Sequence, residues 1–82
     1  MKKQAITVTK ADIDEGCPNS SHFCAMALAF ERAVGGKVSV GCYAIYTIHG
    51  QISHTPESKE FIDDFDNGVK VSPQTFIFEV PE

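Results

Sequence analysis

The sequence of 82 residues contains no tryptophan, three cysteines and no long apolar segment. An odd number of cysteines (Cys17, Cys24 and Cys42) is not typical of a small secreted domain held together by disulfides. No stretch approaches the roughly 18 apolar residues of a membrane span, and the first ten residues lack the apolar core of a signal peptide. We therefore expect a soluble protein of the cytoplasm.

Basic residues are also scarce, and the charge is unevenly distributed. Residues 1–41 hold five basic and four acidic side chains, whereas residues 42–82 hold two basic and seven acidic ones, for a net charge of −4. Direct binding to nucleic acid needs a basic patch, and Lys2 and Lys3 are better explained as a solvated start of the chain. We therefore expect a partner macromolecule with a basic surface, and we expect that this protein does not itself contact nucleic acid or a membrane.

The remaining composition is that of one small globular domain covering residues 1–82. Apolar residues make up 43% of the chain and charged residues 22%, which is typical of a folded protein and not of a disordered one. A chain of this length has a small core relative to its surface, so a homodimer or a tight partner would add stability.

Two helices are predicted in the first half of the chain. Thr9 and Asp12 have the spacing of a capping box, which starts a single helical turn, and Gly16 is expected to end it in the left-handed conformation. A second helix is expected at 22–34, where a wide apolar stripe indicates a deeply buried helix. The stripe consists of Phe23, Met26, Ala27, Phe30, Ala33 and Val34.

Alternating β-branched and aromatic residues predict several strands, with a bend or bulge at Gly41 and a tight turn at His49-Gly50. The expected strands cover 5–9, 37–40, 42–48, 51–54 and 74–80. The order of elements predicts an α+β domain, with a small antiparallel sheet of four to five strands packed on the central apolar helix. A short acidic helix, second to the central apolar helix, completes the domain.

That acidic helix follows Thr55 and Pro56, a capping residue and a proline suited to the first helical position. Phe61, Ile62 and Phe65 share one face, which is expected to dock on the core.

The other side chains of this helix are mostly carboxylates, with Lys59 as the single cation. Glu57, Glu60 and Asp64 are expected to form a row on another side of the helix, and Asp63 and Asp66 flank this row. Like charges at this density repel one another, and a partner that supplies Lys or Arg would relieve the repulsion. The helix is therefore a candidate binding surface, and the alternative is a merely solvated face. Paired carboxylates for glycoside chemistry are not favoured, because no sugar-stacking aromatic residues accompany them.

Cysteine and histidine residues offer two enzyme-like alternatives. Cys17, His22 and Cys24, with His49 or His54, could hold a metal, but the spacing is not that of a zinc motif. Cys24 with His49 or His54 as a base could form a nucleophilic pair, but no motif for an oxyanion site accompanies them. We expect structural roles for these residues, no cofactor and no catalysis.

Tyr43 and Tyr46 are three residues apart in the middle strands, so they are expected on opposite faces. Tyrosine is a frequent anchor of protein interfaces, which makes both residues candidates for partner binding.

Four stretches together resemble a group of short bacteriophage and mobile-element proteins. They are 6–13 (ITVTKADI), 24–29 (CAMALA), 61–68 (FIDDFDNG) and 71–76 (VSPQTF), and they extend over most of the chain. This sequence has Ala25 where the group often has proline. The resemblance implies a phage protein, and small acidic phage proteins without enzymatic motifs include anti-CRISPR inhibitors that bind host effectors stoichiometrically.

We therefore expect an inhibitor in the host cytoplasm that covers a basic nucleic-acid-binding surface of a defence complex, with the acidic helix and a tyrosine in contact. The alternative is a non-enzymatic phage structural or accessory module that associates with itself through a sheet edge.

Overall fold

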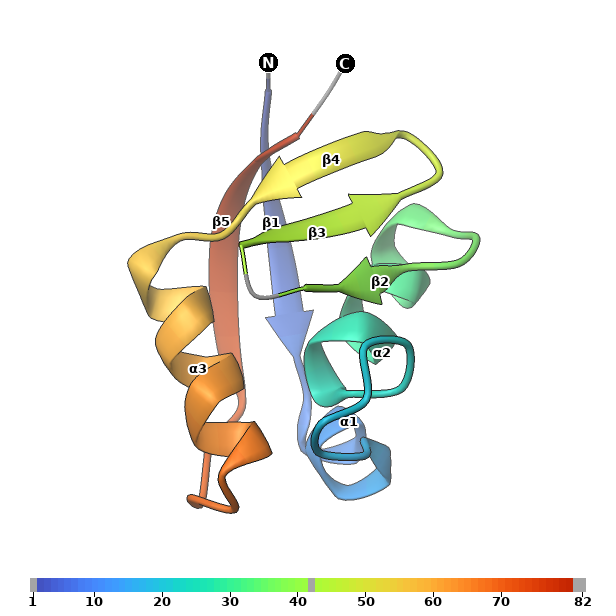
Figure 1. The fold of residues 1–82 in the computed structure, drawn as a ribbon. Coiled ribbons are helices and arrows are strands. Elements are labelled where there is room, and N and C mark those ends of the chain that lie inside the picture. Colours follow the sequence, from blue (N-terminus) through green and yellow to red (C-terminus); the bar gives the residue numbers. More distant parts are fainter. Residues whose placement is uncertain (1, 42, 81–82) are drawn as a thin grey trace.

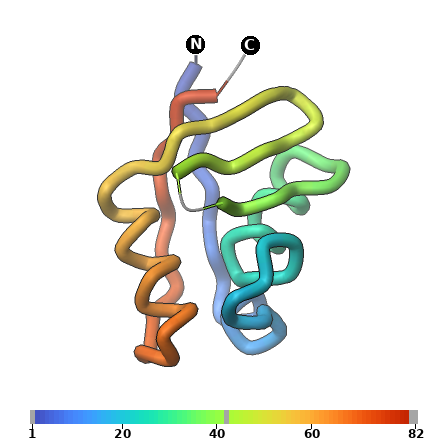
Figure 2. Tube along the Cα trace, viewed as in Figure 1, coloured from blue at the N-terminus to red at the C-terminus, as the bar shows by residue number. Residues whose placement is uncertain are grey.

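The computed structural model describes residues 2–41 and 43–80 (Figures 1 and 2). The described chain runs through β1 (Lys2–Val8), α1 (Lys10–Glu15), α2 (Ala25–Val34), β2 (Ser39–Val40), β3 (Ala44–Thr47), β4 (Gly50–Ser53), α3 (Pro56–Asp66) and β5 (Gln74–Val80). The α+β class is confirmed. The start of the strand expected at 42–48 lies outside the described residues. No helix in the described part is long and apolar enough to cross a lipid bilayer.

The strands form two antiparallel sheets, so the expected single sheet of four to five strands is wrong. β1 and β5 pair along their whole length, from Lys2 opposite Val80 to Val8 opposite Gln74, so the first and the last described strand lie side by side (Figure 2). β2, β3 and β4 form a separate three-stranded sheet that lies across the ribbon of β1 and β5 (Figure 1).

The two sheets stay separate because each has an apolar face that must be buried against another layer. Ile6 and Phe78 of the ribbon and Ile45 and Ile52 of the three-stranded sheet are all at most 2% exposed and belong to one core cluster. The ring of Phe78 also packs edge-on against Phe30 of α2, with centroids 4.9 Å apart. The core therefore lies between stacked layers, which edge-to-edge pairing of all five strands would not provide.

Helix α2 begins three residues later than expected, at Ala25 instead of His22. Cys24 is its N-cap, and its Sγ accepts a hydrogen bond from the N–H of Ala27 (3.4 Å). The preceding loop is folded on itself, since the N–H of Cys17 donates to the carbonyl of Phe23 (2.8 Å). Phe23 is consequently outside the helix and 63% exposed, instead of part of the buried stripe.

The capping box of α1 is confirmed, but the conformation expected at Gly16 is wrong. The Asp12 N–H donates to Thr9 Oγ1 (3.2 Å), and the Thr9 N–H donates to Asp12 Oδ2 (2.9 Å). Gly16 has φ −68° and ψ 150°, which is extended backbone. Glycine is needed there for space, because a Cβ atom would lie 2.7 Å from the backbone nitrogen of Ala25.

The later elements agree closely with prediction. α3 starts after Thr55, and β5 covers the predicted residues with Phe76, Phe78 and Val80 buried on one face. The β3–β4 turn is one residue earlier than expected, since Gly50 already pairs with Thr47 in the ladder.

Candidate functional site

Helix α3 is capped by a reciprocal pair of hydrogen bonds at its start. The N–H of Ser58 donates to Thr55 Oγ1 (3.1 Å), and the N–H of Thr55 donates to Ser58 Oγ (3.0 Å). Pro56 occupies the first turn, where its missing N–H has no intrahelical partner to lose. Thr55 as cap and Pro56 as first residue confirm the sequence prediction, whereas the part played by Ser58 was not foreseen.

The apolar face of α3 docks the helix on the ribbon. Phe61 and Phe65 are 4% and 8% exposed, and Phe61 packs edge-on against Phe76 of β5 with ring centroids 5.4 Å apart. Ile62 is half-buried and packs against the same core cluster. This contact holds α3 along β5 (Figure 1). The remaining side chains of the helix therefore face away from the ribbon.

One side of α3 carries the outer carboxylate row, which we define as Glu57, Glu60 and Asp64. These residues line a hollow of about 290 Å³ between α3 and the segment that leads into β5. The opposite wall is formed by Lys70, Val71, Ser72 and Gln74. Among the described residues, no carboxylate of the row forms an ion pair with Lys or Arg.

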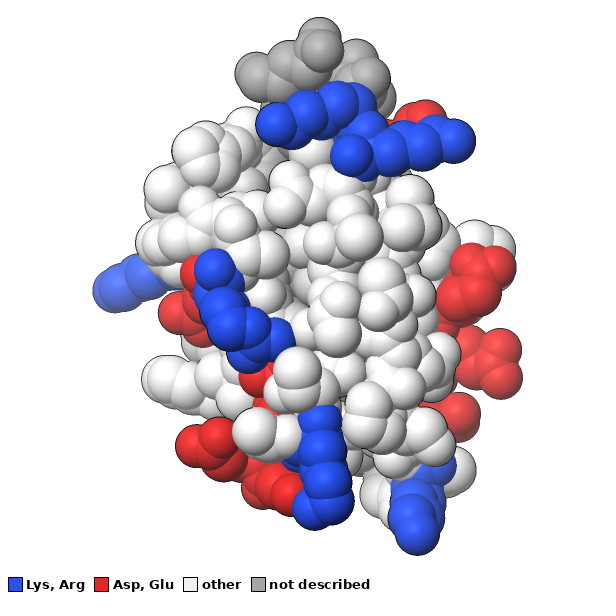
Figure 3. All heavy atoms as spheres, turned by 180° about the vertical axis from the view of Figure 1, so that it is seen from behind, with Lys and Arg blue, Asp and Glu red and all other residues white. Residues whose placement is uncertain are grey.

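The space-filling view shows the consequence for the surface. Acidic side chains lie along the flank that α3 occupies and also on the opposite flank, and a broad uncharged area separates the two groups (Figure 3). The α3 flank is therefore an exposed negative surface next to β5.

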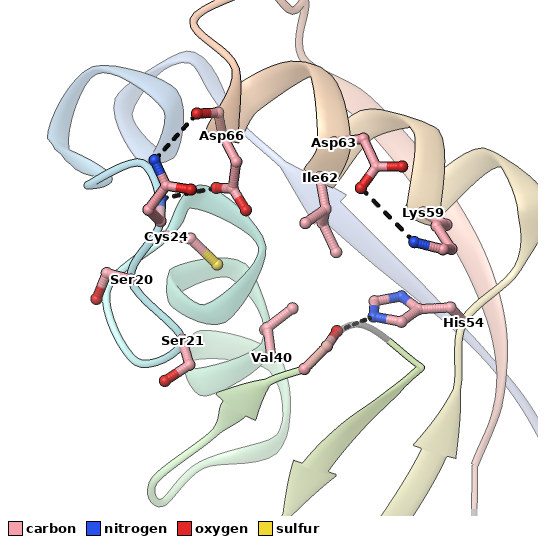
Figure 4. Close-up of a pocket in the computed structure, with 11 residues that line it drawn as sticks. Ser20, Ser21, Cys24, Val40, His54, Lys59, Ile62, Asp63 and Asp66 are labelled. Carbon is pink, nitrogen blue, oxygen red and sulfur yellow. Dashed lines mark hydrogen bonds and ion pairs between the residues drawn. The ribbon is translucent and has the colours of Figure 1, made fainter.

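The other side of α3 uses its carboxylates within the protein. Asp63 Oδ1 lies 3.6 Å from Lys59 Nζ, and Asp66 Oδ1 accepts a hydrogen bond from the N–H of Asn19 (2.8 Å). The Asn19 side-chain amide also donates to the carbonyl of Asp66 (3.1 Å). Figure 4 shows these contacts on the walls of one cavity.

The structure therefore divides the five carboxylates of the expected site between two sides of α3. The 3.6-residue period of the helix places Asp63 and Asp66 on the side away from Glu57, Glu60 and Asp64.

The cavity on that inner side has a volume of about 340 Å³ and lies between the loop that leads into α2, the β2–β3 connection and α3 (Figure 4). Cys24, Val40, His54 and Ile62 are among the residues that line it, with Lys59, Asp63 and Asp66 at its α3 wall. Its charged groups include both members of the Lys59–Asp63 pair, so part of its charge is neutralised internally.

A structural role was expected for His54, but the sequence did not predict its hydrogen-bond partners. Its Nε2 donates to the carbonyl of Gly41 (2.8 Å), because a carbonyl can only accept, and its Nδ1 shares a hydrogen bond with Ser58 Oγ (3.0 Å). The imidazole thus ties the β2–β3 connection to the start of α3. No local motif indicates this, because Gly41 and His54 are brought together only by the fold.

Cys24 and Cys17 differ in their surroundings. Cys24 is 3% exposed, and burial raises the pKa of its thiol, so the thiolate needed for nucleophilic attack is disfavoured. Cys17 is exposed in the loop before α2, and Cys42 lies outside the described residues. His22 and His49 are both exposed. Within residues 2–41 and 43–80, no three His, Cys, Asp or Glu side chains are grouped so that they could hold a metal ion.

The two tyrosines lie apart from the outer carboxylate row. Tyr43 is 86% exposed in the bend before β3, and Tyr46 is 50% exposed on β3 opposite Ser39 and Gln51. Neither lines the hollow beside α3. Tyr43 lies outside the strand, so the alternation used to place it on the opposite face does not apply.

Comparison with protein-family models, with curated proteins and with solved structures finds no match to this chain.

Proposed function

We propose that this protein acts by stoichiometric binding, and that the outer carboxylate row is its contact with a basic surface on a partner. The observation that carries the proposal is the difference between the two sides of α3. Asp63 and Asp66 have partners inside the protein, whereas Glu57, Glu60 and Asp64 line an exposed hollow without an ion pair in the described chain. Carboxylates in this situation attract Lys and Arg of another molecule and steer its approach.

The partner that fits best is a host protein or nucleoprotein complex that holds nucleic acid through Lys and Arg. Such surfaces carry the charge that complements the row, and an acidic protein competes with phosphates for them. The resemblance to short phage and mobile-element proteins favours a CRISPR effector as this complex, which would make the protein an anti-CRISPR inhibitor. Tyr43 and Tyr46 are the candidate anchors if the contact extends over the three-stranded sheet.

The test is binding to a purified CRISPR effector complex, measured by biolayer interferometry at low and at physiological salt. Glu57→Lys/Glu60→Lys should weaken binding about ten- to a hundred-fold, because attractive pairs become repulsive ones. Asp14→Lys/Glu15→Lys on α1 is the matched control, since it changes the net charge equally on exposed residues of another element. It should bind as the native protein does.

Equal weakening by both double variants would show a response to net charge and not to a site. If Glu57→Lys/Glu60→Lys binds the complex as tightly as the native protein does, the contact lies on another surface. The exposed tyrosines are then the next residues to substitute. A complex that binds none of the proteins would contradict the effector as partner.

A further inference from the structure

The ladder of β1 and β5 reveals which backbone groups face outward. Facing residues of an antiparallel pair alternate between those that exchange N–H···O bonds and those that do not, whose side chains lie closer. Thr7 and Thr75 are a pair of the second kind, because their Oγ1 atoms are 3.0 Å apart and the Thr7 carbonyl accepts a hydrogen bond from Arg32 (2.9 Å). By alternation, Ala5 and Ile77 also direct their N–H and C=O groups away from the ladder.

The two outer edges of this ribbon differ. On β1, Arg32 donates a hydrogen bond to the outward carbonyl of Thr7. The same strand begins with Lys2 and Lys3, and charged side chains of this kind protect a sheet edge from pairing with another strand. On β5, the outward N–H and C=O groups of Thr75 and Ile77 make no hydrogen bond to any residue of 2–41 or 43–80. Ile77 is 52% exposed. Ala5 of β1 likewise has no outward hydrogen bond to the described residues, so the edge of β5 is the less protected of the two because it lacks the Arg32 contact and the two lysines.

The β5 edge also borders the outer carboxylate row. The hollow beside α3 extends to Gln74, the first residue of β5 and the neighbour of Thr75. Glu57, Glu60 and Asp64 form its other wall. Unpaired strand groups and unpaired carboxylates thus lie side by side on the same flank, where Figure 3 shows the acidic side chains.

We propose that the edge of β5 takes up an extended segment of the partner as an added strand, and that Lys or Arg at alternate positions of this segment pair with the outer carboxylate row. In β-strand addition, main-chain hydrogen bonds supply affinity and alternate side chains supply specificity. This inference rests on the proposed function, because it gives the basic partner a conformation and a docking line.

The dimensions of the two elements agree. Glu57 and Asp64 are seven residues apart, which is about 10 Å along a helix that rises about 1.5 Å per residue. A strand rises about 3.3 Å per residue, so three alternate side chains span about 13 Å. Two or three basic residues at alternate positions therefore cover the length of the row.

A second copy of this chain is a poorer occupant of the same edge. Because α3 lies along β5, pairing of two β5 edges would bring a second outer carboxylate row up to the first. Like charges that approach in this way repel. Charge complementarity therefore favours a basic segment over self-association.

The test uses a blocked peptide of alternating lysine and valine and measures its affinity by fluorescence anisotropy at low salt. Ile77→Pro removes an outward N–H of β5 without removing a ladder bond, and its binding should be about ten-fold weaker or worse. Ala5→Pro is the matched control, because it removes the outward N–H of the residue facing Ile77 on the other edge. It should bind as the native protein does.

A second measurement does not depend on how the proline variants fold. The same peptide, N-methylated along its centre, keeps its charges but cannot donate backbone hydrogen bonds, and it should bind the native protein about ten-fold more weakly. Equal binding of both peptides, with loss of binding in Glu57→Lys/Glu60→Lys, would overturn strand addition and leave the acidic contact in place.

If both peptides bind Glu57→Lys/Glu60→Lys as tightly as they bind the native protein, the acidic contact is overturned as well. Light scattering is applied to the native protein and to both proline variants. If the native protein is a dimer, and if Ile77→Pro is a monomer while Ala5→Pro stays a dimer, the β5 edge binds a second copy and the basic segment is overturned.

Discussion

At the corner between α1 and α2 the carboxylate of Asp12 is buried and fully bonded, whereas the outer carboxylate row of α3 borders solvent. Asp12 receives two hydrogen bonds from the Arg32 guanidinium (2.7 and 2.8 Å) and one from the N–H of Thr9 (2.9 Å). Its side chain is 6% exposed. Glu57 and Glu60 are exposed and have no ion pair in the described chain.

The difference shows that acidic residues of one small protein serve two purposes. A carboxylate that organises the fold is held by donors from other parts of the chain, here Arg32 of α2 and Thr9, the residue after β1. A carboxylate that has neither burial nor donors contributes little to folding and leaves its charge available to another molecule. We therefore expect substitutions around Asp12 to lower the free energy of unfolding, and substitutions in the outer carboxylate row to weaken partner binding.

The largest effect on stability is expected from Asp12→Ala. Loss of the carboxylate breaks the capping box of α1 and leaves the Arg32 guanidinium with only the Thr7 carbonyl as acceptor, so the free energy of unfolding should fall by about 2–3 kcal/mol. Urea denaturation followed by circular dichroism measures this. Asp14→Ala is the control, because Asp14 pairs only with the exposed Lys10, and it should stay close to native. Similar losses in both would contradict the distinction between the two regions.

The pH dependence of stability sharpens the same contrast. The hydrogen bonds from the Arg32 guanidinium hold the pKa of Asp12 below its ordinary value near 3.8. A carboxyl whose pKa is lowered by folding stabilises the native state above its unfolded pKa, and this stabilisation is lost as the pH falls through the folded pKa. Native protein should therefore lose stability as the pH falls below about 4.

Asp12→Asn should be less stable at neutral pH and should show a shallower loss in that acidic range. Urea denaturation curves at a series of pH values compare the two proteins. Parallel pH dependence of both would contradict the role assigned to Asp12.

The smallest effects are expected within α3. Asp66→Ala removes the hydrogen bond to the N–H of Asn19 that ties α3 to the loop before α2, and should cost about 1 kcal/mol. Glu60→Ala should change stability by no more than about 0.5 kcal/mol while it weakens partner binding. Thermal unfolding and the peptide titration, applied to both variants, separate the two effects. Greater destabilisation by Glu60→Ala would contradict the division of the helix.

Local signals in the sequence predicted much of the fold. Thr9 with Asp12 and Thr55 with Pro56 mark helix starts, because capping depends on residues within one turn. Alternation along 74–80 predicted β5 and its buried face, because strand side chains alternate between faces. The α2 start was misplaced because Cys24, an uncommon cap, lies within an apolar run whose pattern resembles continued helix.

Longer-range features had no local signal. Nothing near His54 indicates that its imidazole binds Gly41, and nothing near Asp66 indicates Asn19, because these residues meet only after the sheets and helices pack. The separation of the strands into two sheets was also missed. Alternation shows which face of a strand is apolar, but it does not show which strand lies beside it.

The amino-acid sequence by itself determined the helix α3, its apolar docking face and the abundance of carboxylates around it, since each depends on neighbours within a few residues. Only the tertiary structure decided which carboxylates are used internally and which face outward. Packing of Phe61 on Phe76 sets the rotation of α3 on the ribbon, and that rotation places Asp66 against Asn19 and the outer carboxylate row beside the open edge of β5.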